Sequence, residues 1–486
     1  MNQVRKNIVY QIIYRVITIL TPLVTSPILS RALGAEKLGI FSATLALVSY
    51  FQLISMLGIE NYGNRTIASA QGDAKKQQTL FWNIYSVQVL SGLLAIILYA
   101  VAFLFIPKER MLISALQGLW LIGSLFNISW FFFGTEQFKL TITRNIIIKL
   151  LTVLLIVLLI RKQEDLGLYV IIMAGDAVLS SLVVWPFLRR SIGLEMPRWD
   201  EMKTHLKPIM ILFIPILAMS VFHIMDKTML DWLGTETDVG YYYSADKVIN
   251  IPLSIITAIG TVMLPRIANE YGKGNMNDVQ VMLRRSTELS AFLICAIGGG
   301  IAAVANEFVP WFFGPGFDPC IELVYWFTPV LAVKAISDLI RTQYMIPAHM
   351  DKDYTVAVFI GAGINLIANL FLIRRFGAPG AVIGTMIAEF AVMISEMWFT
   401  RESISFGKYA LEFSFYLIPM ALLICVVRGV ASVLQIRTSV KLLIMILAGG
   451  LAYILVCTIA WAIKKDSVFR TISIRDLIGR NKKTDE

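Results

Sequence analysis

Charged residues are scarce in this chain. Asp, Glu, Lys and Arg make up 16% of its 486 residues, whereas a soluble globular domain averages about 25%. Hydrophobic residues make up 57%, and the polar segments between the apolar runs are short. No segment is left that could form a soluble catalytic domain. The composition therefore excludes a soluble enzyme and favours a protein for which the lipid bilayer is the solvent.

The usual motifs of catalysis and metal binding are also missing. The chain has no GxxxxGK[ST] phosphate-binding loop, which argues against ATP hydrolysis by this chain. Its few cysteines are widely separated, and none of them forms a CxxC pair. We therefore predict no catalytic residue, no metal site, no disulfide framework and no bound cofactor. The cysteines are Cys295, Cys320, Cys425 and Cys457.

The chain contains instead a succession of about fourteen apolar runs, each near the ~20 residues that an α-helix needs to cross a bilayer. We predict an all-α polytopic membrane protein. Basic residues gather at the ends of alternate runs, with a roughly twofold excess on the side that holds both termini. Both termini are therefore expected in the cytoplasm. The same residues explain the net charge of +10, so nucleic acid is not a predicted partner.

A short pattern recurs between the two halves of the chain. The sequence LGAE at residues 33–36 returns as LGTE at 233–236, and each copy is followed by a further glycine, Gly39 or Gly240. We expect the glycine within each motif to end a helix in the left-handed conformation. The repeat spans six helices, an even number, so it predicts two parallel six-helix lobes around a central cavity, followed by two additional C-terminal helices. The predicted parts are an N-terminal lobe at 1–190, a cytoplasmic inter-lobe linker at 191–207, a C-terminal lobe at 208–404, helices 13 and 14 at 405–463, and a basic cytoplasmic tail at 464–486.

Several basic residues fall inside the predicted spans. Each would cost about 3 kcal/mol near the centre of the bilayer if it stayed dry and unpaired, and together they would outweigh the stability of a typical domain. They must therefore face acidic partners or a hydrated cavity. These basic residues are Arg15, Lys149, Lys227, Lys247, Lys334 and Arg341.

Helical spacing brings some of these charges together. Lys334, Asp338 and Arg341 fall at i, i+4 and i+7 on one face of a helix, and Lys227 and Asp231 are i, i+4. Because Lys and Arg bind phosphate through charge-assisted hydrogen bonds, we predict a cationic cavity for an anionic head group. The alternative is that these residues form buried ion pairs which only fix the helix register. The candidate substrate-binding residues are Arg15, Lys227, Lys334 and Arg341, and the candidate ion-coupling or orienting acids are Asp226, Asp231, Asp338, Asp176 and Glu389.

Four segments resemble a known family of transporters. They are similar to segments of the bacterial polysaccharide-lipid flippases, which export O-antigen, capsule and teichoic repeat units and belong to the multidrug/oligosaccharidyl-lipid/polysaccharide exporter superfamily. The resemblance covers about residues 1–400. The segments are SRALGAEKLG at 30–39, MLGIENYGNR at 56–65, WFFFGTEQ at 130–137 and MLPRIANEY at 263–271.

The resemblance implies a flippase that alternates between inward-open and outward-open states. Its cargo would be an undecaprenyl-diphosphate-linked oligosaccharide, a polyprenyl-diphosphate lipid, moved from the inner to the outer leaflet of the bacterial cytoplasmic (inner) membrane for polysaccharide assembly. The resemblance leaves open coupling to a proton or sodium gradient, and contact with a polymerase and other assembly proteins. Two other functions remain open. One is a cation-coupled multidrug exporter of the same superfamily, and the other is a membrane-embedded polymerase or glycosyltransferase, for which the outer loops are short.

Overall fold

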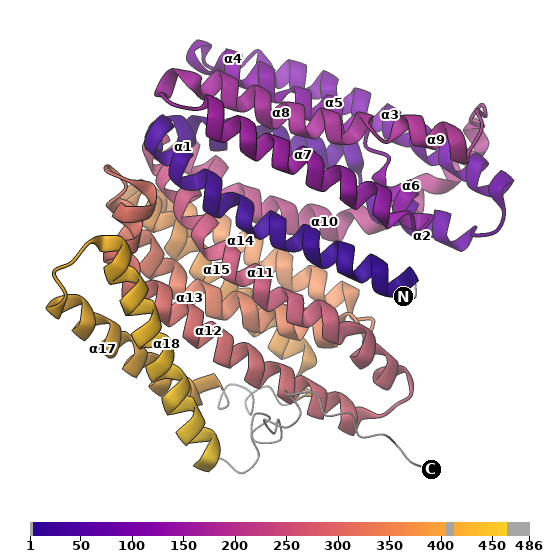
Figure 1. Cartoon of the computed structure of the whole chain (residues 1–486). Coiled ribbons are helices and arrows are strands. Elements are labelled where there is room, and N and C mark those ends of the chain that lie inside the picture. Colours follow the sequence, from indigo (N-terminus) through magenta and orange to yellow (C-terminus); the bar gives the residue numbers. More distant parts are fainter. Residues whose placement is uncertain (1–2, 405–412, 464–486) are drawn as a thin grey trace. The chain divides into compact units, whose positions relative to one another are not determined.

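Every regular element in the described part of the chain is a helix (Figure 1). The structure is a computed structural model that describes residues 3–404 and 413–463, without the side chains of a few helical residues, Arg15 among them. Thirteen of the helices described are long and apolar enough to cross a membrane. The predicted all-α polytopic class is therefore confirmed.

Contacts between Cα atoms divide the chain into two compact units. The first unit comprises Met1–Ser244, Phe313–Phe317 and Asn365–Gly384, and the second comprises the remaining residues. This division groups residues by proximity and does not test the predicted lobes, linker and tail, which stay a prediction.

The first unit contains the helices from α1 to α10 and the beginning of α11. Neighbouring helices such as α7 and α8 run alongside each other (Figure 1). The helices are α1 (Gln3–Met56), α2 (Ile59–Ser69), α3 (Ala74–Phe103), α4 (Lys108–Gln117), α5 (Leu119–Leu125), α6 (Ser129–Gly134), α7 (Phe138–Leu159), η1 (Gln163–Asp165), α8 (Leu166–Leu182), α9 (Trp185–Ser191) and α10 (Trp199–Leu233).

The later helices belong largely to the second unit. Helices α17 and α18 pack against each other as a pair (Figure 1). The elements are α11 (Glu236–Gly272), α12 (Met276–Phe313), α13 (Pro319–Ile340), η2 (Arg341–Met345), α14 (Asp351–Phe376), α15 (Ala378–Thr400), α17 (Leu417–Val433) and α18 (Thr438–Ile463).

The first membrane-length helix accounts for two of the predicted spans. It comprises α1 from Val16 onward together with α2, ends at Ser69 and covers 54 residues, so it would be about 80 Å long if it were straight. That length is more than twice the ~30 Å of the hydrocarbon core. The helix is kinked at Gly34, where φ is 76° and ψ is 172°, a conformation that strains any residue with a side chain. With both arms of this helix counted, the thirteen helices agree with about fourteen crossings.

The following span is broken where the sequence pattern predicts one helix at 111–134. Helices α4, α5 and α6 divide this segment, and residues 126–128 leave the helical path. Gln88 of α3 compensates, because its Nε2 donates to the carbonyl oxygens of Ser124 at 2.8 Å and Asn127 at 3.0 Å. An unsatisfied backbone group in a bilayer costs several kcal/mol, so this side chain stabilises the break.

The two repeated glycines meet at one helix crossing in the first unit. A Cβ on Gly39 would lie 1.7 Å from the carbonyl oxygen of Glu236, and a Cβ on Gly240 would lie 1.9 Å from the carbonyl oxygen of Ala35. The contact is reciprocal, since each copy of the repeat places its glycine on the backbone of the other. Glycine is required at both positions because no side chain fits in this approach.

The second copy of the repeat does not use the expected left-handed turn. Gly234 has φ −117° and ψ −145°, so the prediction of a left-handed cap is wrong at this position. The turn is held instead by Asp238, whose Oδ2 accepts hydrogen bonds from the backbone N of Thr235 at 3.1 Å and from its Oγ1 at 2.7 Å. A side-chain cap of this kind makes a positive φ unnecessary.

The predicted inter-lobe linker at 191–207 is partly helical. Helix α10 begins at Trp199, and Asp200 and Glu201 occupy its first turn. Acidic residues there interact favourably with the positive end of the helix dipole. The polar composition of the segment therefore reflects the start of a helix as well as a connection.

Candidate functional site

A polar cavity of about 830 Å³ lies within the first unit. Its size falls within the roughly 300–1,000 Å³ of ordinary small-molecule sites. The cavity borders the break between α5 and α6, and residues of α1, α2, α7, α8 and α10 complete its wall. Binding sites of transporters are often built around such interrupted helices.

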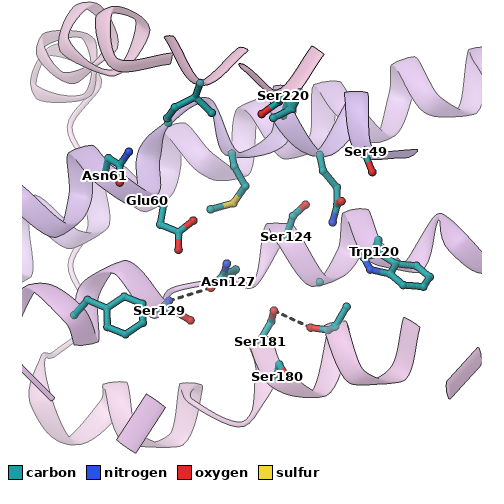
Figure 2. A pocket seen from close by; sticks show the side chains of 18 of the residues that line it. Ser49, Glu60, Asn61, Trp120, Ser124, Asn127, Ser129, Ser180, Ser181 and Ser220 are labelled. Atoms are coloured by element: carbon teal, nitrogen blue, oxygen red, sulfur yellow. Dashed lines mark hydrogen bonds between the residues drawn. The ribbon is translucent and has the colours of Figure 1, made fainter. Parts of the chain in front are cut away.

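Side chains with hydroxyl or amide groups are numerous in the lining of this cavity, among apolar ones, and Figure 2 shows polar side chains from several helices around the space. The Oδ1 atom of Asn127 accepts a hydrogen bond from the backbone N of Ser129 at 3.1 Å, which orients the amide. Trp120 adds an aromatic ring to the wall. The polar side chains are Tyr14, Ser49, Gln52, Glu60, Asn61, Ser124, Asn127, Ser129, Arg144, Asn145, Ser180, Ser181 and Ser220.

Charge is sparse in this lining, since Glu60 and Arg144 are its charged members among the described residues. Hydroxyl and amide groups both donate and accept hydrogen bonds, so they can replace the water around a polyhydroxylated ligand. Trp120 can cover an apolar face of such a ligand. The chemistry of this cavity suits a saccharide better than a multiply charged group.

Asp226 lies in a second polar cluster of the first unit, and its side chain is 3% exposed. Its Oδ2 accepts a hydrogen bond from the hydroxyl of Tyr242 at 2.7 Å. Its Oδ1 accepts bonds from the amides of Asn365 at 3.0 Å and Asn369 at 2.8 Å. The Oδ1 atom of Asn369 is buried without a hydrogen-bond partner. One carboxylate and two amide side chains thus offer several oxygen atoms to a small cation if the amides reorient.

In the second unit, the charged residues that helical spacing groups at 334–341 lie beside acidic residues of α15. Lys334 pairs with Glu389, with 3.4 Å between Nζ and Oε1, and Arg341 pairs with Asp338. Arg341 also begins the π-helical turn η2, a feature that occurs frequently at functional sites. These pairs agree with the alternative of register-fixing ion pairs, and they leave substrate binding by Lys334 and Arg341 a prediction.

Glu396 joins the same cluster. It is fully buried, and its Oε2 accepts a hydrogen bond from the Ser337 hydroxyl at 2.5 Å. With Glu396, three carboxyl groups, Asp338 of α13 and Glu389 and Glu396 of α15, accompany the two basic residues, Lys334 of α13 and Arg341 of η2. The cluster is therefore richer in acidic than in basic groups.

Two other predicted acids have basic partners on neighbouring helices. Asp231 pairs with Arg110 at 2.6 Å between Oδ1 and Nη1, so its ion-pair partner is not Lys227 four residues earlier. Asp176 lies 3.8 Å from Lys149 and accepts a hydrogen bond from Thr152 at 3.0 Å. These contacts link neighbouring helices, and a role of the two acids in ion coupling stays a prediction.

The predicted cations fall in different parts of the chain. The side chain of Arg15 lies outside the described residues. Lys227 belongs to the first unit, where its Nζ lies 5.7 Å from the centre of the Tyr243 ring. Lys334 and Arg341 belong to the second unit. Convergence of the four on one head group stays a prediction.

Sequence reasoning missed the polar cavity of the first unit. Its residues are mostly serines and amides, which cost little in a membrane helix and do not stand out from an apolar run. The available signal was the cluster of Gly118, Gly123 and Asn127 inside the span predicted at 111–134. Arg144 was not predicted as a site residue because it lies near the end of its span. Basic residues in that position are expected to set the orientation of the chain in the membrane.

Two family models each match more than half of the chain. The model of the polysaccharide biosynthesis protein family matches residues 4–269, and the model of the lipid II flippase MurJ matches residues 141–453. The chain belongs to the polysaccharide biosynthesis protein family. The resemblance seen in the sequence segments is therefore confirmed, and this family member is a flippase-type transporter of the multidrug/oligosaccharidyl-lipid/polysaccharide exporter superfamily.

Individual relatives agree with this assignment. A putative O-antigen transporter of Escherichia coli (strain K12) is 22% identical over 409 residues, which are 82% of this chain and 97% of that protein. The solved structure of lipid II flippase MurJ in an inward closed conformation has a TM-score of 0.75 at 14% identity, covering 97% of this chain and 99% of that one. An inward-facing multidrug resistance transporter of the MATE family has a TM-score of 0.60 at 14% identity, covering 79% and 94%. At such identities the structural likeness shows the fold.

The family assignment also excludes one of the open functions. Members of these flippase and exporter families are transporters and not enzymes. The membrane-embedded polymerase or glycosyltransferase is therefore rejected for this multi-pass membrane protein.

Proposed function

We propose that this polysaccharide family member moves an undecaprenyl-diphosphate-linked oligosaccharide repeat unit from the inner to the outer leaflet of the bacterial cytoplasmic membrane by alternating access. Delivery to the outer leaflet would supply cell-surface polysaccharide assembly, where a polymerase is the expected next partner. Both termini would lie in the cytoplasm, as the distribution of basic residues predicts.

The polar cavity of the first unit is the observation that carries this proposal. A saccharide head group cannot cross hydrocarbon without partners for its hydroxyl groups, because each unmet hydrogen bond costs free energy. The cavity supplies such partners inside a bundle of membrane-length helices. A relative described as a putative O-antigen transporter supports the same class of cargo.

We further propose that Asp226 is the site of ion coupling. The buried carboxylate among Tyr242, Asn365 and Asn369 can hold a proton or a sodium ion, since all of these side chains carry oxygen atoms. Gly384 packs on this cluster, where a Cβ would lie 2.1 Å from Asn369 Oδ1. Occupation of the site could therefore change the packing of α14 against α15. A coupled gradient would provide the free energy for directional transport.

Reconstitution tests the transport proposal directly. Purified protein in liposomes should move a fluorescent undecaprenyl-diphosphate-linked oligosaccharide between leaflets, measured by its accessibility to a membrane-impermeant quencher. Liposomes without protein, and liposomes with a sugar-free fluorescent phospholipid, are the controls. Failure to move any of a panel of repeat units would count against the proposal.

A multidrug exporter is the second candidate function, because the fold is also similar to a MATE-family transporter. That function requires acidic groups that bind cationic drugs, and Glu60 in the cavity and buried Asp226 are available acids. The two functions differ in a simple assay. Expression of a multidrug exporter would raise the resistance of a sensitive strain to cationic dyes, whereas a flippase would restore surface polysaccharide in a strain that lacks its own.

A further inference from the structure

A second cavity of the first unit adjoins Arg144. It has a volume of about 920 Å³ and lies between the start of α7 and the residues that join α8 to α9. Apolar side chains form much of its wall, including Ile147, which is 61% exposed, and Phe187, which is 37% exposed. Lys139 contributes a basic group and Glu136 an acidic group to the same groove, and Arg144 adds a second cation. An apolar groove that contains an arginine suits the chain of a lipid whose head group is anionic.

Arg144 lines both this groove and the polar cavity. No other residue of the described structure lines both of them. The cavity suited to a saccharide and the groove suited to a lipid chain therefore share one cationic residue, Arg144.

The guanidinium of Arg144 is poorly satisfied in this position. The residue is 8% exposed. Its Nε and Nη2 donate to Asn145 Oδ1 at 3.0 Å and 2.6 Å, and Nη2 also lies 3.4 Å from Ser129 Oγ. Its Nη1 is buried without a hydrogen-bond partner, and no carboxylate in the described part of the chain forms an ion pair with it. A buried cation that has only neutral partners, and one N–H group without a hydrogen bond, is suited to bind an anion.

We propose that Arg144 binds the diphosphate of the lipid-linked sugar at the junction of these two cavities. The saccharide occupies the polar cavity, and the first isoprene units of the polyprenyl chain occupy the groove beside Ile147 and Phe187. This assignment rests on the proposed function. It names the residue that binds the diphosphate and the groove that binds the polyprenyl chain. A phosphate oxygen on Nη1 would supply both the missing charge and the missing hydrogen bond.

The chemical order of the ligand supports this arrangement. A polyprenyl-diphosphate sugar consists of a polar head, a charged diphosphate and an apolar chain, in that sequence. The protein presents hydroxyl and amide groups, then Arg144, then apolar side chains. A phospholipid lacks a large saccharide, so it would leave the polar cavity unfilled. The groove is therefore assigned to the polyprenyl lipid.

Binding of farnesyl diphosphate, a short polyprenyl diphosphate, tests the role of Arg144. Full-length protein in phosphatidylcholine nanodiscs is titrated with this probe, and Arg144→Gln is expected to raise Kd at least about tenfold. Arg144→Lys should bind with intermediate affinity because a lysine cannot form the bidentate contact. The matched control is Arg198→Gln, whose arginine side chain is 81% exposed and which should leave Kd unchanged. Unchanged affinity in a folded Arg144→Gln protein would overturn the proposal.

A crosslinking arm on the wild-type protein does not depend on the folding of any variant. Farnesyl diphosphate with a photoreactive benzophenone at its chain end should label α7, α8 or α9 near Ile147 and Phe187, as mapped by mass spectrometry. Labels that fall only on other helices would overturn the groove assignment. Displacement of the probe by an equal mole fraction of phosphatidylglycerol would also overturn it, because the groove would then be a general phospholipid site.

The outcome is separable from that of the proposed function. If liposomes move the lipid-linked sugar while Arg144→Gln binds the probe normally, the flippase assignment stands and this inference fails. If wild-type protein binds the probe at Arg144 but moves no lipid-linked sugar, the binding site stands and the transport proposal fails.

Discussion

Gly39 lies against the backbone of Glu236 so closely that a Cβ at position 39 would come within 1.7 Å of the carbonyl oxygen. Gly240 meets the carbonyl oxygen of Ala35 in the same way, at 1.9 Å. Small residues at a crossing allow two membrane helices to pack backbone against backbone. Because the hydrophobic effect does not drive helices together inside a bilayer, van der Waals contacts of this kind stabilise the pair. The crossing joins α1 to α11, two helices that the repeat relates to each other.

We expect Gly39→Ala to lower the free energy of unfolding by about 1–3 kcal/mol, because the added methyl group forces the two backbones apart. The midpoint of thermal unfolding in detergent, followed by tryptophan fluorescence, measures the effect. Gly175→Ala is the matched control, since a Cβ at position 175 of α8 meets no atom within 4 Å. The control should be neutral or slightly stabilising. Equal effects at the two positions would contradict the role of the crossing.

Arg110 links three helices near this crossing. Its guanidinium contacts Asp231 of α10 at 2.6 Å and Glu236 of α11 at 2.7 Å. We expect a double-mutant cycle between Arg110→Gln and Asp231→Asn to give a coupling energy of about 0.5–3 kcal/mol, because the pair is largely shielded from water. Thermal unfolding measures each corner of the cycle.

The control for this cycle is a pair in an exposed loop. Lys162 and Glu164 lie 3.9 Å apart, and their side chains are 69% and 73% exposed. Such surface pairs contribute little, so the coupling between Lys162→Gln and Glu164→Gln should be near zero. A coupling at the Arg110 pair that is no larger than this control would show that the contact has no stabilising role.

Trp120 provides an aromatic wall in the polar cavity. We expect Trp120→Ala to reduce the initial rate of lipid-linked sugar movement in liposomes about three- to tenfold, because a stacking surface for the saccharide is lost. Trp120→Phe should retain most of the rate, since it keeps a flat apolar ring. Trp232→Ala is the control, because Trp232 is 77% exposed and lies outside the cavity lining. Equal rates for Trp120→Ala and wild type would argue against sugar binding at this wall.

Hydropathy and helix length are properties of single segments, and this is why most of the architecture was predictable. The apolar runs on either side of Gly34 predicted two spans separated at this glycine, and the helix is kinked there. The helix break at 126–128 was not predictable in the same way. It depends on Gln88, a residue of another helix, to satisfy the freed carbonyl groups. Tertiary partners of this kind leave no periodic signal in the sequence.

In the candidate site too, contacts between different helices could not be predicted from the sequence. Spacing along one helix predicted that Asp338 and Arg341 lie close together, because residues three and four apart share a helix face, and the two form an ion pair. It could not show that Asp231 pairs with Arg110, more than a hundred residues away in the chain. Contacts between helices depend on their relative rotation and depth, which one sequence does not specify.

Replacement of Asp226 tests the coupling proposal. Asp226→Asn removes the charge and keeps the shape of the side chain, so the cluster with Tyr242, Asn365 and Asn369 should stay packed. We expect the variant to lose the dependence of transport on a proton or sodium gradient and to move cargo at least about tenfold more slowly when a gradient is imposed. Transport is measured in liposomes with each gradient applied in turn. Asp278→Asn, at an exposed position of α12, is the control. Wild-type gradient dependence in Asp226→Asn would remove this residue from the coupling mechanism.

The ion pair between Lys334 and Glu389 can distinguish cargo binding from a purely structural role. Removal of one partner leaves a largely buried charge without its counterion, so Lys334→Met alone is expected to destabilise the protein by about 3–5 kcal/mol. The double variant Lys334→Met/Glu389→Met removes both charges and should regain stability close to that of the wild type. If Lys334 also binds the head group, as its helical spacing predicts, the stable double variant should still move lipid-linked sugar at least about tenfold more slowly. Thermal unfolding and liposome transport, measured on the same preparations, separate the two effects. A double variant with wild-type stability and wild-type transport would show that the pair serves helix packing alone.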